Sequence, residues 1–375
     1  MIYLDHGATS FPKPKSVLNA MNYAMETCAN PGRGGYEAAM RASRTVLKCR
    51  ERAGELFDCS PEQVVCTGSC THGLNMAIGT LVKPGSRVVI SGFEHNAVVR
   101  PLYALGAHLQ IAGRKLFDPE DTLAQFEQAL RSGADAAVFT HVSNVFGYIL
   151  PVEEMARLCR KYRVPFAVDC AQSAGILPVS LRDWEADFIA MPGHKGLLGP
   201  MGTGLLLCNR VPKPLMSGGT GSQSKLRQMP DFLPDAGEAG TANVAGIAGL
   251  SEGIWQVQKQ GLKEIFTREQ REMRRCAKRL EKFGYTVYTG ENQCGTVSFV
   301  PKYGCEELAD ALGKQGVCVR AGLHCAPLAH ESAGTLSTGT VRISFGHDAD
   351  MRQTGALCTA LEKIQNLEGK TEGKM

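Results

Sequence analysis

The sequence predicts an α/β fold whose larger part is a mostly parallel sheet covered by helices on both faces. Between residues 64 and 207, short apolar runs alternate with longer amphipathic stretches. Such alternation is typical of buried parallel strands joined by crossover helices. The chain has 375 residues, of which 43% are apolar and 21% charged, so it is long and apolar enough to form a sizeable core.

The predicted strands of this part are bounded by turn-forming residues. They are Val64–Thr67, Arg87–Ile90, Ala136–His141, Phe166–Asp169, Phe188–Ala190 and Gly204–Leu207. Amphipathic patterns over Pro119–Arg131 and Val152–Tyr162 predict two of the intervening helices. The second helix should end before Pro165, because a residue that precedes proline disfavours the helical conformation.

Residues 210–241 interrupt the alternation with a stretch rich in Pro, Gly and Ser. Long loops in compact domains are usually functional or disordered. A continuous helix is expected from about Asn243 to Lys282, after which a second alternation begins. Its expected strands are Tyr285–Tyr288, Thr296–Phe299, Cys318–Arg320 and Val341–Phe345, and its helices are Glu306–Gln315 and Asp348–Asn366. We predict a large domain over residues 1–260 and a small C-terminal domain over 261–375, with the N-terminal segment packing on either.

Composition excludes several classes of function. Lys and Arg number 41 against 37 Asp and Glu, and the resulting charge of +4 is not gathered into a basic block, so nucleic acid is a poor partner. No apolar stretch approaches the roughly 20 residues that span a bilayer, and the N-terminus lacks the features of a signal peptide. The fourteen scattered cysteines then indicate reduced thiols in a cytoplasmic protein, most of them in the core.

A lysine and an aspartate follow neighbouring predicted strands. Lys195 lies in the motif PGHKG at 192–196, and Asp169 ends the strand before it. Ligands of open α/β sheets bind at this edge, where an aspartate could keep a pyridinium nitrogen protonated while a lysine holds the ring's aldehyde as a Schiff base. Taken singly, the lysine could be a solvated turn residue and the aspartate a helix N-cap.

Two further segments end at the same edge. His95 follows the predicted strand Arg87–Ile90 and could stack on a flat cofactor, although a lone histidine is more often structural. The segment TGSCTHG at 67–73 runs from a strand into a helix, where backbone amides and the Thr71 hydroxyl could hold a phosphate. An ordinary N-cap looks similar. Neither dinucleotide-binding nor P-loop motifs occur.

The ordered set of these segments resembles a known family. The matching stretches are YLDHGATSFPKP, GRGGYEAAM, FEHNAVVRPL, THVSNVFG, VDCAQSAG, PGHKGLLGPMGTG, EAGTANVAGIAGL, VRAGLHCAP and VRISFG. Across residues 2 to about 346 the chain is similar to fold-type I pyridoxal-phosphate enzymes of the class V aminotransferase group, and within it to cysteine desulfurases and selenocysteine lyases. The resemblance implies pyridoxal 5′-phosphate as cofactor and a homodimer with sites at the subunit interface.

The resemblance also implies a role for each matching residue. Lys195 would carry the cofactor, Asp169 would bind the pyridinium nitrogen, His95 would stack on the ring and Gln172 would reach its hydroxyl. Cys70, Thr71 and His194 would surround the phosphate, with Thr241 arriving from a second subunit. Asn144 and Arg342 would grip the substrate's carboxylate, and Arg33 and Arg320 would line the entrance.

The motif RAGLHCAP at 320–327 resembles the short catalytic-cysteine loop of the family's second group. Beside Arg320 and His324, Cys325 is expected in an electropositive setting that favours the thiolate. The implied reaction removes the sulfur of L-cysteine as a persulfide on Cys325 and releases L-alanine.

The cofactor-binding segments also depart from the family pattern. Pro192 stands where relatives often carry a hydroxyl, Cys70 and His72 replace a more usual threonine and glutamate, and Asn96 stands where some relatives have a second histidine. These differences leave the preferred substrate open.

Four other functions are alternatives to the desulfurase. They are a selenocysteine lyase, an aminotransferase or β-lyase that forms no persulfide, a non-catalytic scaffold of the same fold, and a zinc protein. The motif around Cys325 disfavours the aminotransferase. The presence of Lys195, Asp169, His95 and Cys325 together disfavours the scaffold, and the His and Cys spacing disfavours zinc. A sulfur-acceptor protein is an expected partner, whereas nucleic acid and membranes are not.

Overall fold

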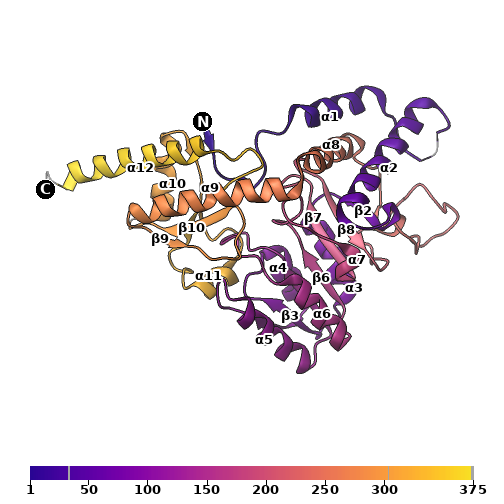
Figure 1. The fold of residues 1–375 in the computed structure, drawn as a ribbon. Coiled ribbons are helices and arrows are strands. Elements are labelled where there is room, and N and C mark those ends of the chain that lie inside the picture. Colours follow the sequence, from indigo (N-terminus) through magenta and orange to yellow (C-terminus); the bar gives the residue numbers. More distant parts are fainter. Residues whose placement is uncertain (33, 303, 373–375) are drawn as a thin grey trace.

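A seven-stranded sheet forms the centre of the larger part of the molecule in the computed structural model, which describes residues 1–32, 34–302 and 304–372 (Figure 1). Its order is β2-β8-β7-β6-β5-β3-β4, and the four pairings from β7 to β4 are parallel, whereas β8 pairs antiparallel with both β2 and β7. The strands are β2 (Val64–Thr67), β3 (Arg87–Ser91), β4 (His108–Ala112), β5 (Ala136–Thr140), β6 (Phe166–Asp169), β7 (Phe188–Pro192) and β8 (Gly204–Cys208). The predicted mostly parallel sheet is confirmed.

Helices cover both faces of this sheet, as the unbroken apolar strands require. Along β7, Ile189 and Met191 pack into one core with α2, α5, α6 and α8, while Phe188 and Ala190 pack into the opposite core with α3 and α4. The helices of this part are α1 (Lys15–Thr27), α2 (Glu37–Phe57), α3 (Cys70–Leu81), α4 (Asn96–Ala104), α5 (Pro119–Arg131), α6 (Val152–Tyr162), α7 (Leu181–Trp184) and α8 (Val244–Gln260).

The C-terminal part has its own sheet and core. Its sheet, in the order β12-β13-β10-β9, is antiparallel at every pairing. The elements are α9 (Leu262–Lys282), β9 (Thr286–Tyr288), β10 (Thr296–Val300), α10 (Cys305–Lys314), β11 (Val317–Cys318), β12 (Arg320–Gly322), α11 (Pro327–Ala333), β13 (Thr340–Ser344) and α12 (Met351–Glu372). No helix in the described ranges is long and apolar enough to cross a membrane.

The N-terminal segment joins the two parts. Strand β1 (Ile2–Tyr3) pairs with β11, and Leu4 is fully buried in the C-terminal core. The chain then crosses to the large sheet, where Ser10 donates its backbone N–H to the His194 carbonyl at 3.0 Å. Helix α1 follows and packs against α8 (Figure 1). Residues 5–10, which we call the N-terminal strap, therefore span the boundary between the parts.

Two predicted elements were wrong, and one strand was missed. The helix expected over Asn243–Lys282 is broken at Gly261, whose φ of 86° ends α8 and starts α9. The strand expected over Cys318–Arg320 is two strands, because β11 pairs with β1 while β12 joins the C-terminal sheet. Strand β4 was missed, since it lies at the sheet edge and is half-buried, with no continuous apolar run.

Candidate active site

One cavity of about 250 Å³ lies at the carboxyl ends of the parallel strands, where open α/β sheets bind ligands. The last residues of β5, β6 and β7 line the cavity; they are Thr140, Asp169 and Pro192. The predicted site residues that line it are Cys70, Thr71, His95, Asn144, Asp169, Gln172, His194, Lys195, Arg320, Cys325 and Arg342. Segments more than 250 positions apart in sequence are thus brought to one site.

Lys195 follows β7 in a tight turn and lines the cavity. Its backbone carbonyl accepts a hydrogen bond from Leu198 N–H at 2.9 Å, which fixes the turn. Burial is the main cause that lowers the pKa of the Lys195 amine, and the nearby Arg342 lowers it further, while Asp169 opposes the shift. A lowered pKa increases the fraction of neutral amine, which is the nucleophilic form.

Asp169 is 2% exposed at the end of β6. Its Oδ1 accepts hydrogen bonds from Ala171 N–H at 2.9 Å and from the Cys70 thiol at 3.4 Å. No donor from the described residues reaches Oδ2, although Asp169 lines the cavity. One carboxylate oxygen is therefore left for a ligand's N–H.

His95 enters the same wall from the loop after β3. Its Nδ1 accepts a hydrogen bond from Ala97 N–H at 3.0 Å, so this nitrogen carries no proton and a neutral ring is protonated at Nε2. Burial is the largest cause that lowers the pKa of His95. The imidazole is consequently a neutral, flat group, and its protonated Nε2 is not used in the contact with the start of α4.

The start of α3 forms the expected anion-binding end of the cavity. Ser69, Cys70 and Thr71 line it, and the first amides of a helix have no intrahelical acceptor. The Cys70 thiol, however, donates a hydrogen bond to Asp169 and is not one of the groups that could bind the anion. His72 is turned away, with Nδ1 accepting from Gly68 N–H at 3.3 Å.

His194 lies beside the same end of the cavity, with Nδ1 3.0 Å from Thr9 Oγ1. Burial chiefly lowers its pKa to about 4, so the ring is neutral near pH 7. His194 would therefore bind an anion as a neutral hydrogen-bond donor and not as a cation.

Two arginines face each other across the C-terminal sheet at the cavity's other end. Arg320 on β12 is directly opposite Arg342 on β13, and both line the cavity. Like charges at opposed positions are destabilising unless an anion lies between or beside them. Arg342 is 2% exposed, its Nη2 lies 2.6 Å from Asp5 Oδ1, and its Nε is buried without a hydrogen-bond partner among the described residues. This arrangement fits a carboxylate ligand.

Cys325 lies on a short loop between β12 and α11. All fourteen cysteines lie in the described residues and none forms a disulfide, but eight are buried, five are half-buried and Cys325 alone is exposed. His324 and Cys325 have φ values of 49° and 57°, a conformation that costs non-glycine residues energy. The loop is held by Asn96 N–H, which donates to the Cys325 carbonyl at 2.8 Å, and by Asn144 Nδ2, which donates to the His324 carbonyl at 2.8 Å.

The expectation that His324 supplies positive charge beside Cys325 was wrong. The side chain is 6% exposed, and its Nε2 lies 3.2 Å from both the backbone oxygen and Oγ1 of Thr340. Burial chiefly lowers its pKa to about 2, so the ring is neutral. Of the two expected cations, Arg320 remains.

The N-terminal strap and Lys13, which follows it, complete the site, although no role was predicted for them from the sequence. Asp5 pairs with Arg342, and the Gly7 carbonyl accepts from Gln172 Nε2 at 3.0 Å. A Cβ on Gly7 would lie 3.2 Å from Arg342 Cζ and 3.2 Å from Ser344 Oγ, so a side chain here would have to push these groups away by a few tenths of an ångström. Lys13 Nζ donates to the His194 carbonyl at 2.7 Å, next to Lys195. The charged residues Asp5 and Lys13 in the motif YLDHGATSFPKP were the sequence feature that could have predicted these contacts.

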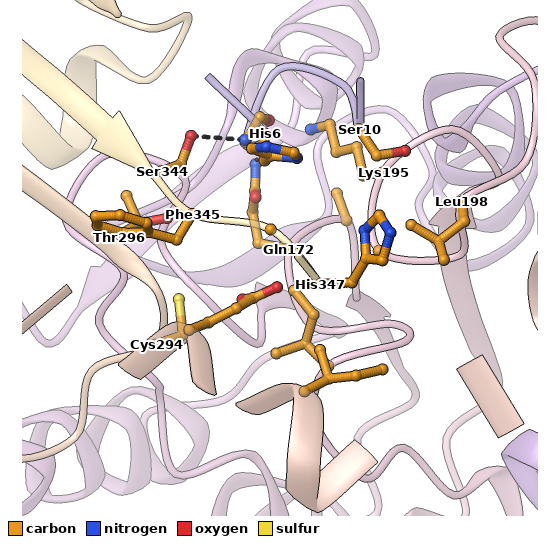
Figure 2. Close-up of a pocket in the computed structure, with 17 residues that line it drawn as sticks. His6, Ser10, Gln172, Lys195, Leu198, Cys294, Thr296, Ser344, Phe345 and His347 are labelled. Atoms are coloured by element: carbon orange, nitrogen blue, oxygen red, sulfur yellow. Dashed lines mark hydrogen bonds between the residues drawn. The ribbon is translucent and has the colours of Figure 1, made fainter. Parts of the chain in front are cut away.

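A second cavity, of about 30 Å³, shares Gly7, Ala171, Gln172 and Lys195 with the first. Figure 2 shows Lys195 and Gln172 in its wall together with His6 and His347. Glu269 of α9 also lines it, is 3% exposed, and makes no hydrogen bond or ion pair with the residues that the structure describes. Burial raises the pKa of this carboxyl to about 8, so it holds a proton at neutral pH. The volume suits ordered water.

Two predicted site residues lie outside this arrangement. Thr241 is exposed and does not line the cavity, so its contribution from a second subunit stays a prediction. Arg33 lies outside the described residues.

The fold and the cavity together define a pyridoxal-phosphate enzyme of fold type I. The free Asp169 Oδ2 fits a protonated ring nitrogen, Lys195 fits an aldehyde, His95 offers a flat face and the start of α3 fits a phosphate. In the described part of the chain no group of three or more His, Cys, Asp or Glu residues could hold a metal ion.

Comparison with known proteins agrees with this class. Residues 2–357 match the aminotransferase class-V family. A probable cysteine desulfurase of Methanothermobacter thermautotrophicus is 32% identical over 98% of this chain and 95% of its own, and a cysteine desulfurase of Escherichia coli is 29% identical over 98% and 94%. The apo structure of a cysteine desulfurase from Thermococcus onnurineus superposes with a TM-score of 0.88 at 29% identity, covering 97% of this chain and 94% of its own. The chain belongs to the class V aminotransferase family and, within it, is similar to cysteine desulfurases.

Proposed function

We propose that this chain is a pyridoxal-phosphate-dependent cysteine desulfurase, which converts L-cysteine to L-alanine and leaves a persulfide on Cys325. The observation that carries the proposal is the position of Cys325. The one exposed thiol among fourteen lies in the same cavity wall as Lys195 and Asp169. The relatives described as cysteine desulfurases, which match nearly the full chain, support the same activity.

Substrate binding would rest on the two opposed arginines. Arg342 lines the cavity, and its planar guanidinium would bind the substrate's α-carboxylate. Asp5 and the Asn144 carbonyl, the latter at 3.0 Å, hold the guanidinium in place. Arg320 adds a second positive charge at the same end. With the carboxylate held there, the rest of the amino acid extends between Lys195 and Cys325.

Lys195 would exchange protons at the substrate's α-carbon. Pyridoxal phosphate supplies, when bound, an electron sink for negative charge at that carbon. The lowered pKa of Lys195 keeps a share of the amine neutral and able to accept a proton. Asp169 Oδ2, to which no described residue donates, would accept a hydrogen bond from the protonated ring nitrogen.

Sulfur transfer would belong to Cys325. Its thiolate attacks the substrate's sulfur, so that a sulfur–sulfur bond forms and the carbon–sulfur bond breaks. The electron pair of that bond stays with the carbon skeleton, which takes up a proton and leaves as alanine. One L-cysteine and the Cys325 thiol are thus converted to one L-alanine and one persulfide, and no external oxidant or reductant is needed. A soft thiolate suits an electrophilic sulfur, and Asn144 and Asn96 hold the loop that presents it.

We further propose a homodimer. Exposed apolar side chains gather on α1, α2 and α8, which pack side by side (Figure 1). They are Leu18, Tyr23, Met25, Met40, Leu47 and Trp255, each at least 43% exposed. A second copy covering this surface would protect them from water and could bring its own Thr241 to this subunit's phosphate site. Light scattering with size-exclusion chromatography measures the state directly.

We also propose a division into two domains, a sulfur-acceptor partner and a location in the cytoplasm. Gly261, which separates α8 from α9, supports the division of the chain into residues 1–260 and 261–375. Strand β1 belongs to the first range in sequence but pairs with β11 of the smaller part. The exposure of Cys325 supports a sulfur-acceptor protein that comes to the loop. We place the protein in the cytoplasm, where its free thiols would stay reduced.

The proposal is tested by incubating the holoenzyme with L-cysteine and measuring alanine and total persulfide. We expect equal amounts of both in a single turnover. Parallel incubation with L-selenocysteine compares the two chalcogens, and alanine from selenocysteine alone would assign a selenocysteine lyase instead. Alanine from neither substrate would overturn the proposal.

A further inference from the structure

The Cys70 thiol occupies an unusual position in the floor of the cavity. Cys70 is the first residue of α3 and is 8% exposed. Its neighbours at the helix start face the anion-binding end of the cavity, but its Sγ lies 3.4 Å from Asp169 Oδ1. The contact joins the start of α3 to the end of β6, which are the two elements that would hold opposite ends of one cofactor.

This contact determines which carboxylate oxygen is free. Oδ1 accepts both the Cys70 thiol and Ala171 N–H, whereas no described residue donates to Oδ2. An aspartate carboxylate rotates easily about its last torsion. Two donors on one oxygen restrict that rotation and keep the other oxygen in the cavity wall.

The thiol is suited to act as a donor here. Burial and the neighbouring Asp169 raise the pKa of Cys70 well above its ordinary value, so the sulfur keeps its proton. A thiol is also a weak donor, which leaves most of the carboxylate's negative charge for a ring nitrogen. A second buried negative charge beside Asp169 is thereby avoided.

We propose that Cys70 is a positioning residue, which holds the Asp169 carboxylate so that Oδ2 faces the ring nitrogen of pyridoxal phosphate. The inference rests on the role of Asp169 in the proposed function but not on the substrate. Cys70 acts through Asp169 and needs no contact with the substrate or with Cys325.

The test uses Cys70→Ala and Cys70→Ser, each alone and combined with Asp169→Asn. For each, the Kd of pyridoxal phosphate is measured by equilibrium dialysis, and the visible absorbance of the bound cofactor is titrated with pH. We expect Cys70→Ala to raise the Kd about three- to tenfold, which corresponds to the loss of one hydrogen bond from a weak donor, and to shift the absorbance midpoint. Serine, which keeps a donor of similar size, should restore the Kd to within about twofold.

The double variants separate positioning from packing. If Cys70 acts through Asp169, adding Cys70→Ala to Asp169→Asn should change the Kd less than about twofold, because the charged acceptor is already gone. An undiminished effect in that background, or equal losses for alanine and serine, would overturn the proposal. So would an unchanged Kd and titration in Cys70→Ala. Because cofactor binding is read directly, a failed desulfurase assay would leave this result interpretable.

Discussion

Replacing Asp5 with asparagine removes the buried counter-charge of Arg342. The two side chains are joined at 2.6 Å, Arg342 is 2% exposed and Asp5 is 18% exposed. Arg320 stands opposite Arg342, so the loss of Asp5 leaves two facing cations. The substitution keeps the shape and one oxygen acceptor, removes the negative charge and replaces the second oxygen with an NH2 group.

The expected loss follows from the burial of the pair. Two unit charges about 4 Å apart attract by about 4 kcal/mol at an effective dielectric constant near 20. Removing one member of a buried pair typically costs about 3–5 kcal/mol, because the other charge stays buried. Asparagine retains a hydrogen bond worth about 1 kcal/mol, so the net loss in the free energy of unfolding should be about 2–4 kcal/mol.

Urea denaturation of the cofactor-free protein at pH 7, followed by circular dichroism, measures this loss. The matched control is Asp350→Asn, which makes the same change in a surface pair with Arg352, 87% exposed. It should cost less than about 1 kcal/mol, because the pair is exposed and asparagine can still accept the hydrogen bond from Arg352 N–H at the start of α12. Excess acetate should recover part of the Asp5→Asn loss by occupying the arginines. Equal stability of the two variants, or no effect of acetate, would refute the reasoning.

Two further predictions concern single residues. Burial raises the pKa of Glu269 from 4.5 to about 8, so between these values the folded carboxyl holds a proton that the unfolded one has lost, and stability falls as pH rises. The non-titrating Glu269→Gln should therefore lose less stability than the wild type from pH 5 to pH 8, by about 2–4 kcal/mol in urea denaturation, and parallel curves would contradict this. Gly261→Ala should cost about 1–3 kcal/mol in the same assay because φ is 86° there, whereas Gly313→Ala, in open space on α10, should be neutral or stabilising; similar effects at both sites would show that Gly261 is not constrained.

Local patterns predicted α5, α6 and the central strands of the large sheet closely. The bounds of α5 and α6 agree with the amphipathic patterns, because Asp118 caps the first and Arg163, in a left-handed conformation before Val164 and Pro165, ends the second. The break at Gly261 was not predicted, because apolar periodicity continues on both sides and one glycine is tolerated inside many helices.

The site was predicted to the extent that strand ends determine it. Lys195, Asp169 and His95 follow strands of one parallel sheet, so their proximity follows from the topology. The pairing of Asp5 with Arg342 did not, because it joins residues 337 positions apart through a crossing strap that no local pattern shows. The neutral state of His324 was also missed, since it depends on burial against Thr340.

The central claim is that Cys325 receives the substrate's sulfur. The most direct measurement is intact mass after a single turnover with L-cysteine, comparing the wild type with Cys325→Ala and, as a matched control, Cys28→Ala, a half-buried cysteine outside the cavity. The account predicts one added sulfur atom in the wild type and the control, and none in Cys325→Ala. An added sulfur in Cys325→Ala that is released by a thiol reductant would contradict it.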